Sequence, residues 1–211
     1  FHSHKNMTTL GEGGMLVVRD PEWADIVPML RHNGHRPYSV DRPDYWIPAM
    51  TDVTLPRLKG KALWPINCCL GEVSCALGTQ LLDRVDEMNA QRRARALAVI
   101  DALADCPELV FHREASLRHS YYLLAARVQE GLRDRFIRRM AEHHGIQCVV
   151  QYYPLNRYPL YRDLGFGEAV VPSTDAFFDN MVSLPFSHLL TDVQIKQIIP
   201  ATRETVEFLR R

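Results

Sequence analysis

The sequence lacks the features that mark several classes of protein. None of its apolar runs approaches the roughly 20 residues of a membrane-spanning helix, and no basic-then-apolar leader opens it. Neither sign of charge is in excess, because 25 lysine and arginine residues stand against 25 aspartate and glutamate residues. A nucleic acid or a membrane is therefore not an expected partner.

Cysteine is scarce, and its pattern argues against a disulfide framework or a zinc site. The five cysteines are odd in number and lie in apolar stretches: Cys68, Cys69, Cys75, Cys106 and Cys148. Reduced cysteines of a cytoplasmic protein have this pattern, so we expect them to pack in the core. No second cysteine pair stands at ligand spacing, and His2 with His4 alone makes no zinc site, so no metal is expected.

The first third of the chain mixes short elements with a long proline-rich stretch. Met15–Val18 has the composition of a strand, and Asp20 followed by Pro21 predicts the start of a helix that stops at Gly34. Residues 35–65 contain five of the 13 prolines and no periodic pattern. Such a loop either lies over a site or a subunit interface, or is an ordered surface meander.

The rest of the chain alternates between helical and strand patterns. We expect, in order, a long helix over 70–103, a strand over 119–128, a helix ended by Gly145, a strand over 146–153, and a last helix that opens with a Thr191–Gln194 capping box and is kinked at Pro200. This order predicts a compact α/β or α+β lobe. With 211 residues and 46% hydrophobic composition, the chain suffices for one or two domains.

The strongest candidates for catalytic or phosphate-binding residues lie near the beginning of the sequence. Lys5, one of only four lysines, precedes the glycine-rich run Gly11–Gly14. Taken singly, the lysine is explained by an ordinary surface position and the glycines by a hairpin turn. The run lacks the lysine-serine tail of a P-loop and the spacing of a dinucleotide fingerprint.

As a string, these residues are more specific. FHSHKNMTTLGEGGM resembles the segment S-F-H-x-x-K-N-x-T-x-G-E-G-G of the DegT/StrS family of sugar aminotransferases, with one extra residue near Leu10. The matching positions are Phe1, His2, Lys5, Asn6, Thr9, Glu12, Gly13 and Gly14. The resemblance implies an α/β fold of fold-type I and a Schiff base between Lys5 and pyridoxal 5'-phosphate. The serine that begins the pattern would lie one position before Phe1.

Two further segments also resemble the family. WPINCCLGEVSCALG is similar to G-Y-N-Y-R-M-x-E-x-Q-A-A, and VSLPFSHLLTDVQ is similar to S-L-P-x-x-x-x-L-T-D-x-Q. Asn67 matches the asparagine that in the family reaches the cofactor phosphate of the partner subunit, which implies a homodimer. Cys69 replaces the arginine that is usual at its position.

The segment VVQYYPLNRYPLY departs from the family pattern V-H-Y-x-P-x-H. Gln151 and Asn156 stand where histidines would face the substrate. Both can hydrogen-bond hydroxyl groups, but neither exchanges protons as histidine does. A keto-cyclitol or an unusual keto-sugar therefore fits as well as a nucleotide-linked keto-sugar.

The resemblance also implies an organisation and a reaction. Residues 1–66 would end the large cofactor-binding lobe, and residues 67–211 would form the small carboxy-terminal lobe. An amino-terminal half, required for activity, would precede them. The amino donor would be glutamate or glutamine, in polysaccharide or secondary-metabolite biosynthesis. The alternative is a truncated or non-catalytic module that acts in dimerisation or regulation. A related dehydratase branch has histidine in place of the lysine, and Lys5 argues against that branch.

Overall fold

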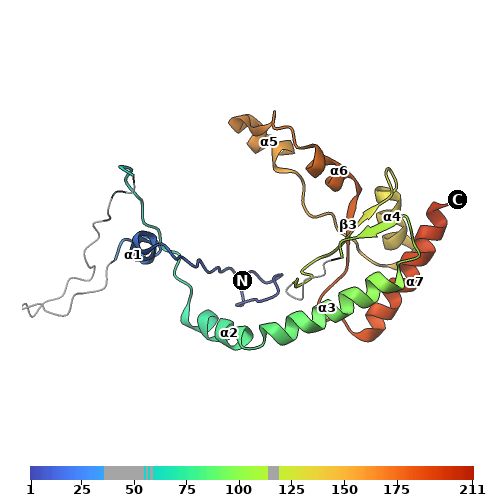
Figure 1. The fold of residues 1–211 in the computed structure, drawn as a ribbon, viewed down its shortest axis with the longest axis horizontal. Coiled ribbons are helices and arrows are strands. Elements are labelled where there is room, and N and C mark those ends of the chain that lie inside the picture. The colour runs from blue at the N-terminus through green and yellow to red at the C-terminus, as the bar shows by residue number, and fades with distance from the viewer. Residues whose placement is uncertain (36–54, 56, 58, 114–118) are drawn as a thin grey trace, which may run out of the picture. The chain divides into compact units, whose positions relative to one another are not determined.

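The computed structural model describes residues 1–35, 55, 57, 59–113 and 119–211 (Figure 1). The chain divides into two compact units, Phe1–Asp83 and Arg84–Arg211, and each is described on its own. The expected lobes, 1–66 and 67–211, remain a prediction. Most of the proline-rich stretch expected to cover a site or an interface lies outside the described residues. The described part has no helix that is both long and apolar enough to cross a membrane.

The first helix, α1 (Pro21–Leu30), begins and ends near the predicted positions. Asp20 is its N-cap, and the Asp20 carboxylate accepts a hydrogen bond from the Glu22 amide at 2.9 Å. Past the end of the helix, Gly34 adopts a left-handed φ of 82° and donates to the Met29 carbonyl at 2.8 Å. The local signals of cap, proline and glycine therefore set both ends of α1.

The strand predicted at Met15–Val18 is wrong. These residues form extended chain without strand pairing, and the side chains of Met15, Leu16 and Val17 are exposed. Composition supplies the apolar side chains of a strand, but a strand forms only where a neighbouring segment pairs with its backbone. No described residue pairs with this segment.

The single long helix predicted over 70–103 is also wrong, because the structure has two helices there. These are α2 (Glu72–Leu82) and α3 (Val85–Ala102), separated by a turn at Asp83 and Arg84. Asp83 closes α2 by donating to the Thr79 carbonyl at 3.2 Å. The apolar spacing continues across this turn, so periodicity alone did not reveal the break.

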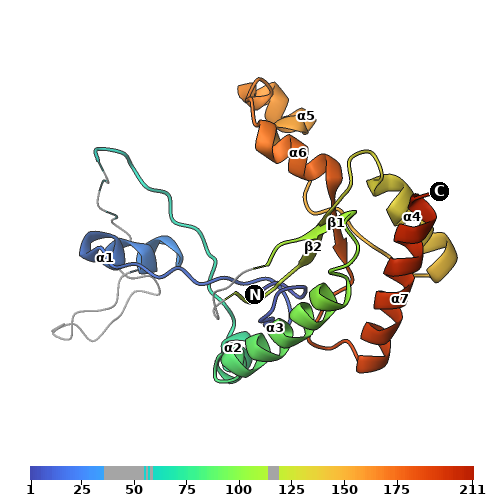
Figure 2. The same cartoon turned by 45° about the vertical axis from the view of Figure 1, so that its right-hand side comes forward.

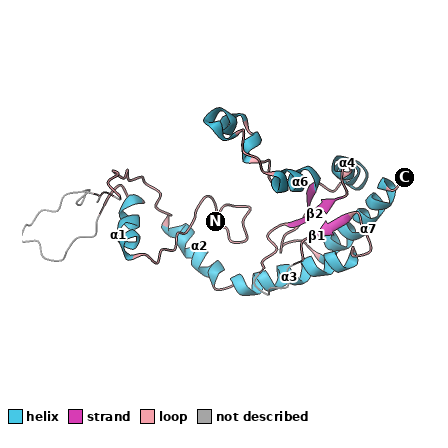
Figure 3. Cartoon of the chain, turned by 45° about the horizontal axis from the view of Figure 1, so that its top comes forward, coloured by secondary structure: helices cyan, strands magenta, loops and turns pink. Residues whose placement is uncertain are grey.

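The second unit contains a three-stranded antiparallel sheet in the order β1-β2-β3 (Figure 3, magenta). The strands are β1 (Leu109–Phe111), β2 (Leu124–Val128) and β3 (Met181–Leu184). Only β2 was predicted, as the end of the expected strand 119–128. Strands of three and four residues are too short to show an alternating pattern in the sequence.

The strand predicted over 146–153 is reduced to one bridge. Val149 and Ser183 exchange two backbone hydrogen bonds, of 2.7 and 3.1 Å, and no ladder continues from them. The residues that follow instead form short helical segments: η1 (Leu155–Arg157), α5 (Pro159–Tyr161), the π-helical turn η2 (Arg162–Phe166) and α6 (Pro172–Asn180). This region departs from strand geometry because Pro154 and Pro159 fix the backbone after the bridge.

Two helices pack together beside the sheet, α4 (Arg133–His144) and α7 (Asp192–Leu209) (Figure 2). Gly145 ends α4 in the left-handed conformation, and Thr191 with Gln194 forms the capping box that opens α7, so both predictions are confirmed. The buried core joins these helices to α3 and the sheet through Ala96, Val99, Leu103, Leu124, Phe136, Met140, Val182 and Val206.

The cysteines only partly follow the prediction. Cys106 and Cys148 are buried, and burial raises the pKa of the Cys148 thiol to about 12. Cys68, Cys69 and Cys75 are exposed, so the expected core position is wrong for these three. They lie in extended chain and in the first turn of α2, a helix that buries none of its residues.

Arg92 on α3 is a buried arginine that binds backbone carbonyls. It is 3% exposed and donates to the carbonyl oxygens of Ser120, Tyr121 and Tyr122, at 3.3, 3.1 and 2.8 Å. Burial lowers the pKa of its guanidinium, which also lies 5.2 Å from the ring centroid of Phe186. Arg92 therefore fixes the segment that leads into β2.

Arg92→Ala is expected to lower the free energy of unfolding by about 3 kcal/mol, because it leaves three carbonyl oxygens without their donor and opens a cavity. Urea unfolding measures this loss. The matched control is Arg138→Ala, an exposed arginine of α4, which should change stability by less than about 0.5 kcal/mol. A loss below about 1 kcal/mol for Arg92→Ala contradicts the assigned role.

Two histidines of the second unit hold a ring nitrogen away from solvent. His144 Nε2 and His188 Nδ1 are buried without a hydrogen-bond partner among the described residues. Desolvation lowers the pKa of both side chains, and the charges of Arg92 and Arg95 lower that of His188 further. Below about pH 6.5 the unfolded chain therefore binds more protons at these two sites than the folded chain does.

The stability of the protein should therefore fall as the pH drops below about 6.5, because the stabilising contribution of the neutral histidines is present only above the unfolded pKa. In the His144→Gln, His188→Gln double variant this dependence should flatten between about pH 7.5 and pH 5.5. Urea midpoints across this range measure it, with His4→Gln as control. An unchanged slope in the double variant contradicts the prediction.

Candidate functional site

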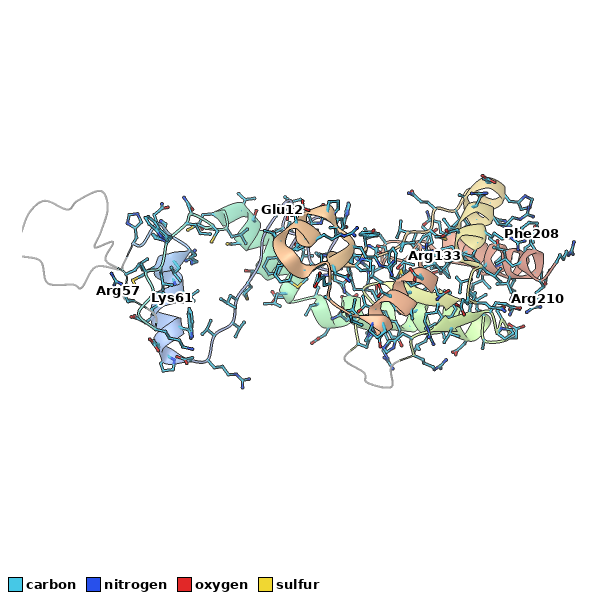
Figure 4. The ribbon with its side chains drawn as sticks, turned by 90° about the horizontal axis from the view of Figure 1, so that it is seen from above. Glu12, Arg57, Lys61, Arg133, Phe208 and Arg210 are labelled. Atoms are coloured by element: carbon cyan, nitrogen blue, oxygen red, sulfur yellow. The ribbon has the colours of Figure 1, made fainter. Side chains whose placement is uncertain are left out.

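Lys5 lies in an exposed turn of the first unit. Its backbone amide donates to the carbonyl of His2 at 2.9 Å. The His2 ring supports the turn from both nitrogens, because Nδ1 accepts from the His4 amide at 3.1 Å and Nε2 lies 3.4 Å from the Glu12 carboxylate (Glu12 is labelled in Figure 4). The backbone that carries Lys5 is therefore held by local hydrogen bonds.

Thr9 anchors this turn to helix α2. Its side chain is 1% exposed and lies between two glycines. A Cβ atom on Gly13 would approach Thr9 Oγ1 to 3.2 Å and Leu70 Cδ1 to 3.0 Å, and a Cβ atom on Gly78 would approach Thr9 Cγ2 to 3.3 Å. Both glycines thus permit a close approach that a larger residue would disturb.

Two polar side-chain atoms within four residues of Lys5 in the sequence are buried without a partner among the described residues. Asn6 Oδ1 and Thr9 Oγ1 form no hydrogen bond with any described residue. A buried polar atom without a partner is unfavourable, and in native proteins such atoms are rare. The resemblance pointed to both residues, whereas only the structure gives their burial.

Asn67 is exposed on an extended segment that is fixed to the end of α1. It forms an isolated antiparallel bridge with His32, and the flanking amides of Ile66 and Cys68 donate to the carbonyls of Leu30 and Arg31, at 2.8 and 2.9 Å. The Asn67 Oδ1 atom accepts from the Cys69 amide at 3.3 Å. The side chain is thereby held in one orientation at the surface of this unit.

A cavity of about 1250 Å³ lies within the same unit. Its walls are mostly apolar and include Glu12–Gly14, Met15–Val18, Trp23, Arg31, Trp64 and Cys68–Leu70. The cavity therefore adjoins the segment Glu12–Val18, which lies carboxy-terminal to Lys5, and the segment Cys68–Leu70, which directly follows Asn67. Lys5 itself is not among its lining residues.

Gln151 and Asn156 lie in the second unit. Gln151 donates from its backbone to the Met181 sulfur and from Nε2 to the Tyr152 hydroxyl, at 3.3 and 3.4 Å. Asn156 Nδ2 donates to the Ala169 carbonyl at 3.1 Å. Both side chains are half-buried. Lys5 and Asn67 thus belong to the first unit, and Gln151 and Asn156 belong to the second.

An arginine that sequence reasoning missed holds the segment of Asn156. Arg157 pairs with Asp179 at 3.0 Å and with Asp175, and its guanidinium lies 5.2 Å from the Phe178 ring centroid. The two carboxylates raise the pKa of Arg157. No spacing rule in the sequence indicated this pair of bonds to α6.

A second cluster lies between α4 and α7. The ligand atoms of His143, His144 and Glu204 lie within 4.8 Å of one another. Glu204 also binds Arg139 at 3.3 Å, and the nearby histidines and Arg139 lower its pKa although desolvation opposes this. The positive charge of Arg139 disfavours a cation here, and the cluster fits a structural contact between the helices.

The sequence pattern of the DegT/DnrJ/EryC1/StrS aminotransferase family matches residues 1–203. The chain belongs to this family. It is 26% identical, over 98% of its length, to the spore coat polysaccharide biosynthesis protein SpsC of Bacillus subtilis, and covers 52% of that protein. It is 28% identical, also over 98%, to the dTDP-3-amino-3,4,6-trideoxy-alpha-D-glucose transaminase of Streptomyces venezuelae, and covers 49% of it.

Solved structures of the family share the fold. DesV of S. venezuelae, solved in complex with a ketimine intermediate, superposes with a TM-score of 0.74 at 26% identity, over 97% of this chain and 49% of that one. The pyridoxal phosphate form of the sugar aminotransferase Spr1654 from Streptococcus pneumoniae gives 0.75 at 24%, over 99% and 51%. The predicted fold-type I class is confirmed, and the chain spans about half the length of the curated relatives it matches.

Thr9→Val should leave the stability unchanged or raise it by up to about 1 kcal/mol, because it replaces an unpaired buried hydroxyl with a methyl group of the same shape. Thr9→Ser keeps the hydroxyl but loses the methyl group against Gly78, and should cost about 1 kcal/mol. Thermal and urea unfolding compare the two variants. The reverse order would mean that the Thr9 hydroxyl has a partner in the folded protein.

Proposed function

We propose that the protein containing this chain is a pyridoxal 5'-phosphate-dependent aminotransferase. Its amino donor is glutamate or glutamine. Its acceptor is either a nucleotide-linked keto-sugar or a keto-cyclitol. The observation that carries this proposal is the placement of Lys5. It lies in an exposed turn, within a segment that matches the family. Thr9, packed between Gly13 and Gly78, anchors this turn.

The residues around Lys5 fit an aldehyde cofactor that carries a phosphate. Lys5 is an exposed residue that carries the primary amine with which an aldehyde condenses. Thr9 Oγ1 is buried without a partner within the described chain, and its hydroxyl can donate to a phosphate oxygen, whereas Asn6 Oδ1 can only accept. Asn67 presents a fixed amide at the surface, as an inter-subunit phosphate contact requires.

Pyridoxal phosphate, when bound, supplies an electron sink for the substrate carbon. Lys5 Nζ would hold this cofactor covalently through its aldehyde, and would be released when the amine of the donor takes its place. The released Nζ then carries a proton to and from the substrate carbon. Asn67 Nδ2 would donate to the cofactor phosphate of the partner subunit, and the active form would then be a homodimer.

Gln151 and Asn156 bind the sugar substrate by hydrogen bonds to its hydroxyl groups. Because Asn156 Nδ2 is already bound to the Ala169 carbonyl, its Oδ1 is the atom that accepts from a substrate hydroxyl. Neither residue titrates, so both would bind the sugar without taking part in proton transfer. The names of the spore coat polysaccharide protein and of the dTDP-amino-sugar transaminase support a sugar substrate in polysaccharide or secondary-metabolite biosynthesis. We place this reaction in the cytoplasm.

The test is Lys5→Ala in the intact protein. The wild type should show a visible absorption band that borohydride bleaches, and Lys5→Ala should lose both the band and transamination, by about a thousandfold or more. The matched control is Lys61→Ala, another exposed lysine of the same unit (Figure 4), which should keep both.

Two outcomes contradict this proposal. A band that persists in Lys5→Ala would place the covalent attachment on another residue. A wild type that forms no band, and transfers no amino group from glutamate or glutamine to any of a panel of keto-sugars and keto-cyclitols, would favour the non-catalytic module that acts in dimerisation or regulation.

A further inference from the structure

The two ends of the loop that carries Lys5 lie side by side. The Phe1 amino nitrogen donates to the Gly13 carbonyl oxygen at 2.6 Å, and the Phe1 carbonyl oxygen accepts from the Thr9 amide at 3.1 Å. A Cβ atom on Gly13 would lie 3.4 Å from Phe1 Cβ. Residues 2–12 therefore form a closed loop, whose first and last neighbours, Phe1 and Gly13, stand opposite each other.

This closure sets the direction and the register of any backbone pairing beyond the loop. A parallel pair needs a connection of about a dozen residues or more, usually a helix, and residues 2–12 contain no helix. Pairing beyond the loop is therefore antiparallel. With Phe1 opposite Gly13, the residue two positions before Phe1 stands opposite Met15, and the residue four positions before Phe1 stands opposite Val17.

The segment Met15–Val18 has the properties of a strand whose partner lies outside the described residues. The side chains of Met15, Leu16 and Val17 are 74, 70 and 80% exposed, and no hydrogen bond joins their amides to a described residue. Successive side chains of an extended segment point to opposite faces, so both faces are apolar here. Such a segment is typical of a sheet that is covered on both sides.

An apolar cavity lies against this segment. The cavity of about 1250 Å³ described above is lined by Met15–Val18, by Trp23 and other apolar residues of α1, and by Trp64. Arg31 Nη1 donates to Cys69 Sγ at 3.4 Å, so the wall that contains Trp64 is also bonded to the end of α1. Apolar walls of this extent are typical of a surface that another part of a protein covers.

The relatives of this chain have further residues that could cover this surface, because the chain covers only 52% of the Bacillus subtilis protein and 49% of the Streptomyces venezuelae transaminase. We propose that, in the intact protein, the segment directly before Phe1 pairs with Met15–Val18 as an antiparallel strand, and that its side chains fill part of the cavity. The surface is thus an interface within one chain. The proposal needs an intact protein longer than this chain, as the proposed function does.

Amide hydrogen exchange of the intact protein, resolved to single residues, tests the pairing. The amides of Met15 and Val17 should exchange at least about a hundredfold more slowly than those of an unstructured chain, because each donates to the segment before Phe1. Glu130, in the exposed turn after β2, is the unprotected reference. Ala126, which β2 pairs with both of its neighbours, is the protected one. The measurement requires no bound cofactor.

An engineered disulfide tests the register. Leu16 and the residue three positions before Phe1 would form a pair without hydrogen bonds, with Cα atoms about 4.5 Å apart, which a disulfide can span. Cysteine at both positions should give an intramolecular disulfide on oxidation, in a protein whose three exposed cysteines are changed to serine. The matched control has Val17→Cys in place of Leu16→Cys and should stay reduced, because residue 17 points to the opposite face.

Three results overturn the proposal. The first is exchange of Met15 and Val17 as fast as that of Glu130, and this result is read on the wild type, whatever the variants do to folding. The second is a disulfide of Leu16→Cys that joins two chains, which would assign the segment to a second copy. The third is a disulfide that forms equally well with Val17→Cys. A protein that keeps the pairing but shows no absorption band contradicts only the proposed function.

Discussion

The packing of Thr9 between Gly13 and Gly78 is the constraint on which the first unit depends. It joins the turn that carries Lys5 to helix α2, because only the two glycines let backbone and side chain approach to this distance. The Lys5 amine is thereby carried on a backbone that hydrogen bonds hold in place. A lysine that attaches a cofactor and later moves a proton needs such a fixed backbone, since misplacement of a reacting group by 1 Å costs much of its effect.

The sequence predicted the features that depend on neighbours along the chain. Asp20, Gly145 and the Thr191 capping box were placed correctly because caps act on backbone groups within a few residues. The strand at Met15–Val18 was wrong because a strand also needs a paired partner, which no local pattern supplies. The turn at Asp83 was missed because the apolar spacing of α2 continues into α3.

The candidate site likewise has residues that the sequence pointed to and contacts that only the structure could reveal. Lys5 and Asn67 were identified through a family pattern, which depends on the order of residues. The buried acceptor Thr9 Oγ1 and the approach of Arg31 to Cys69 required coordinates, because tertiary contacts produce both. Gln151 and Asn156 were selected as departures from the pattern, and the structure adds that the Asn156 amide nitrogen is already bound.

Several arginine side chains of the second unit donate hydrogen bonds to backbone carbonyl oxygens in its loops. Arg92 donates to three carbonyls before β2, Arg95 to the carbonyls of His188 and Leu190, and Arg133 to that of Phe178. A planar guanidinium can serve several carbonyl oxygens at once. These carbonyl acceptors are uncharged, so added salt screens such bonds far less than it screens the ion pairs that Arg95 and Arg133 also form, with Asp192 and Asp134. The loops around the sheet should consequently keep their conformation at ionic strengths that would dissociate a surface held by opposite charges.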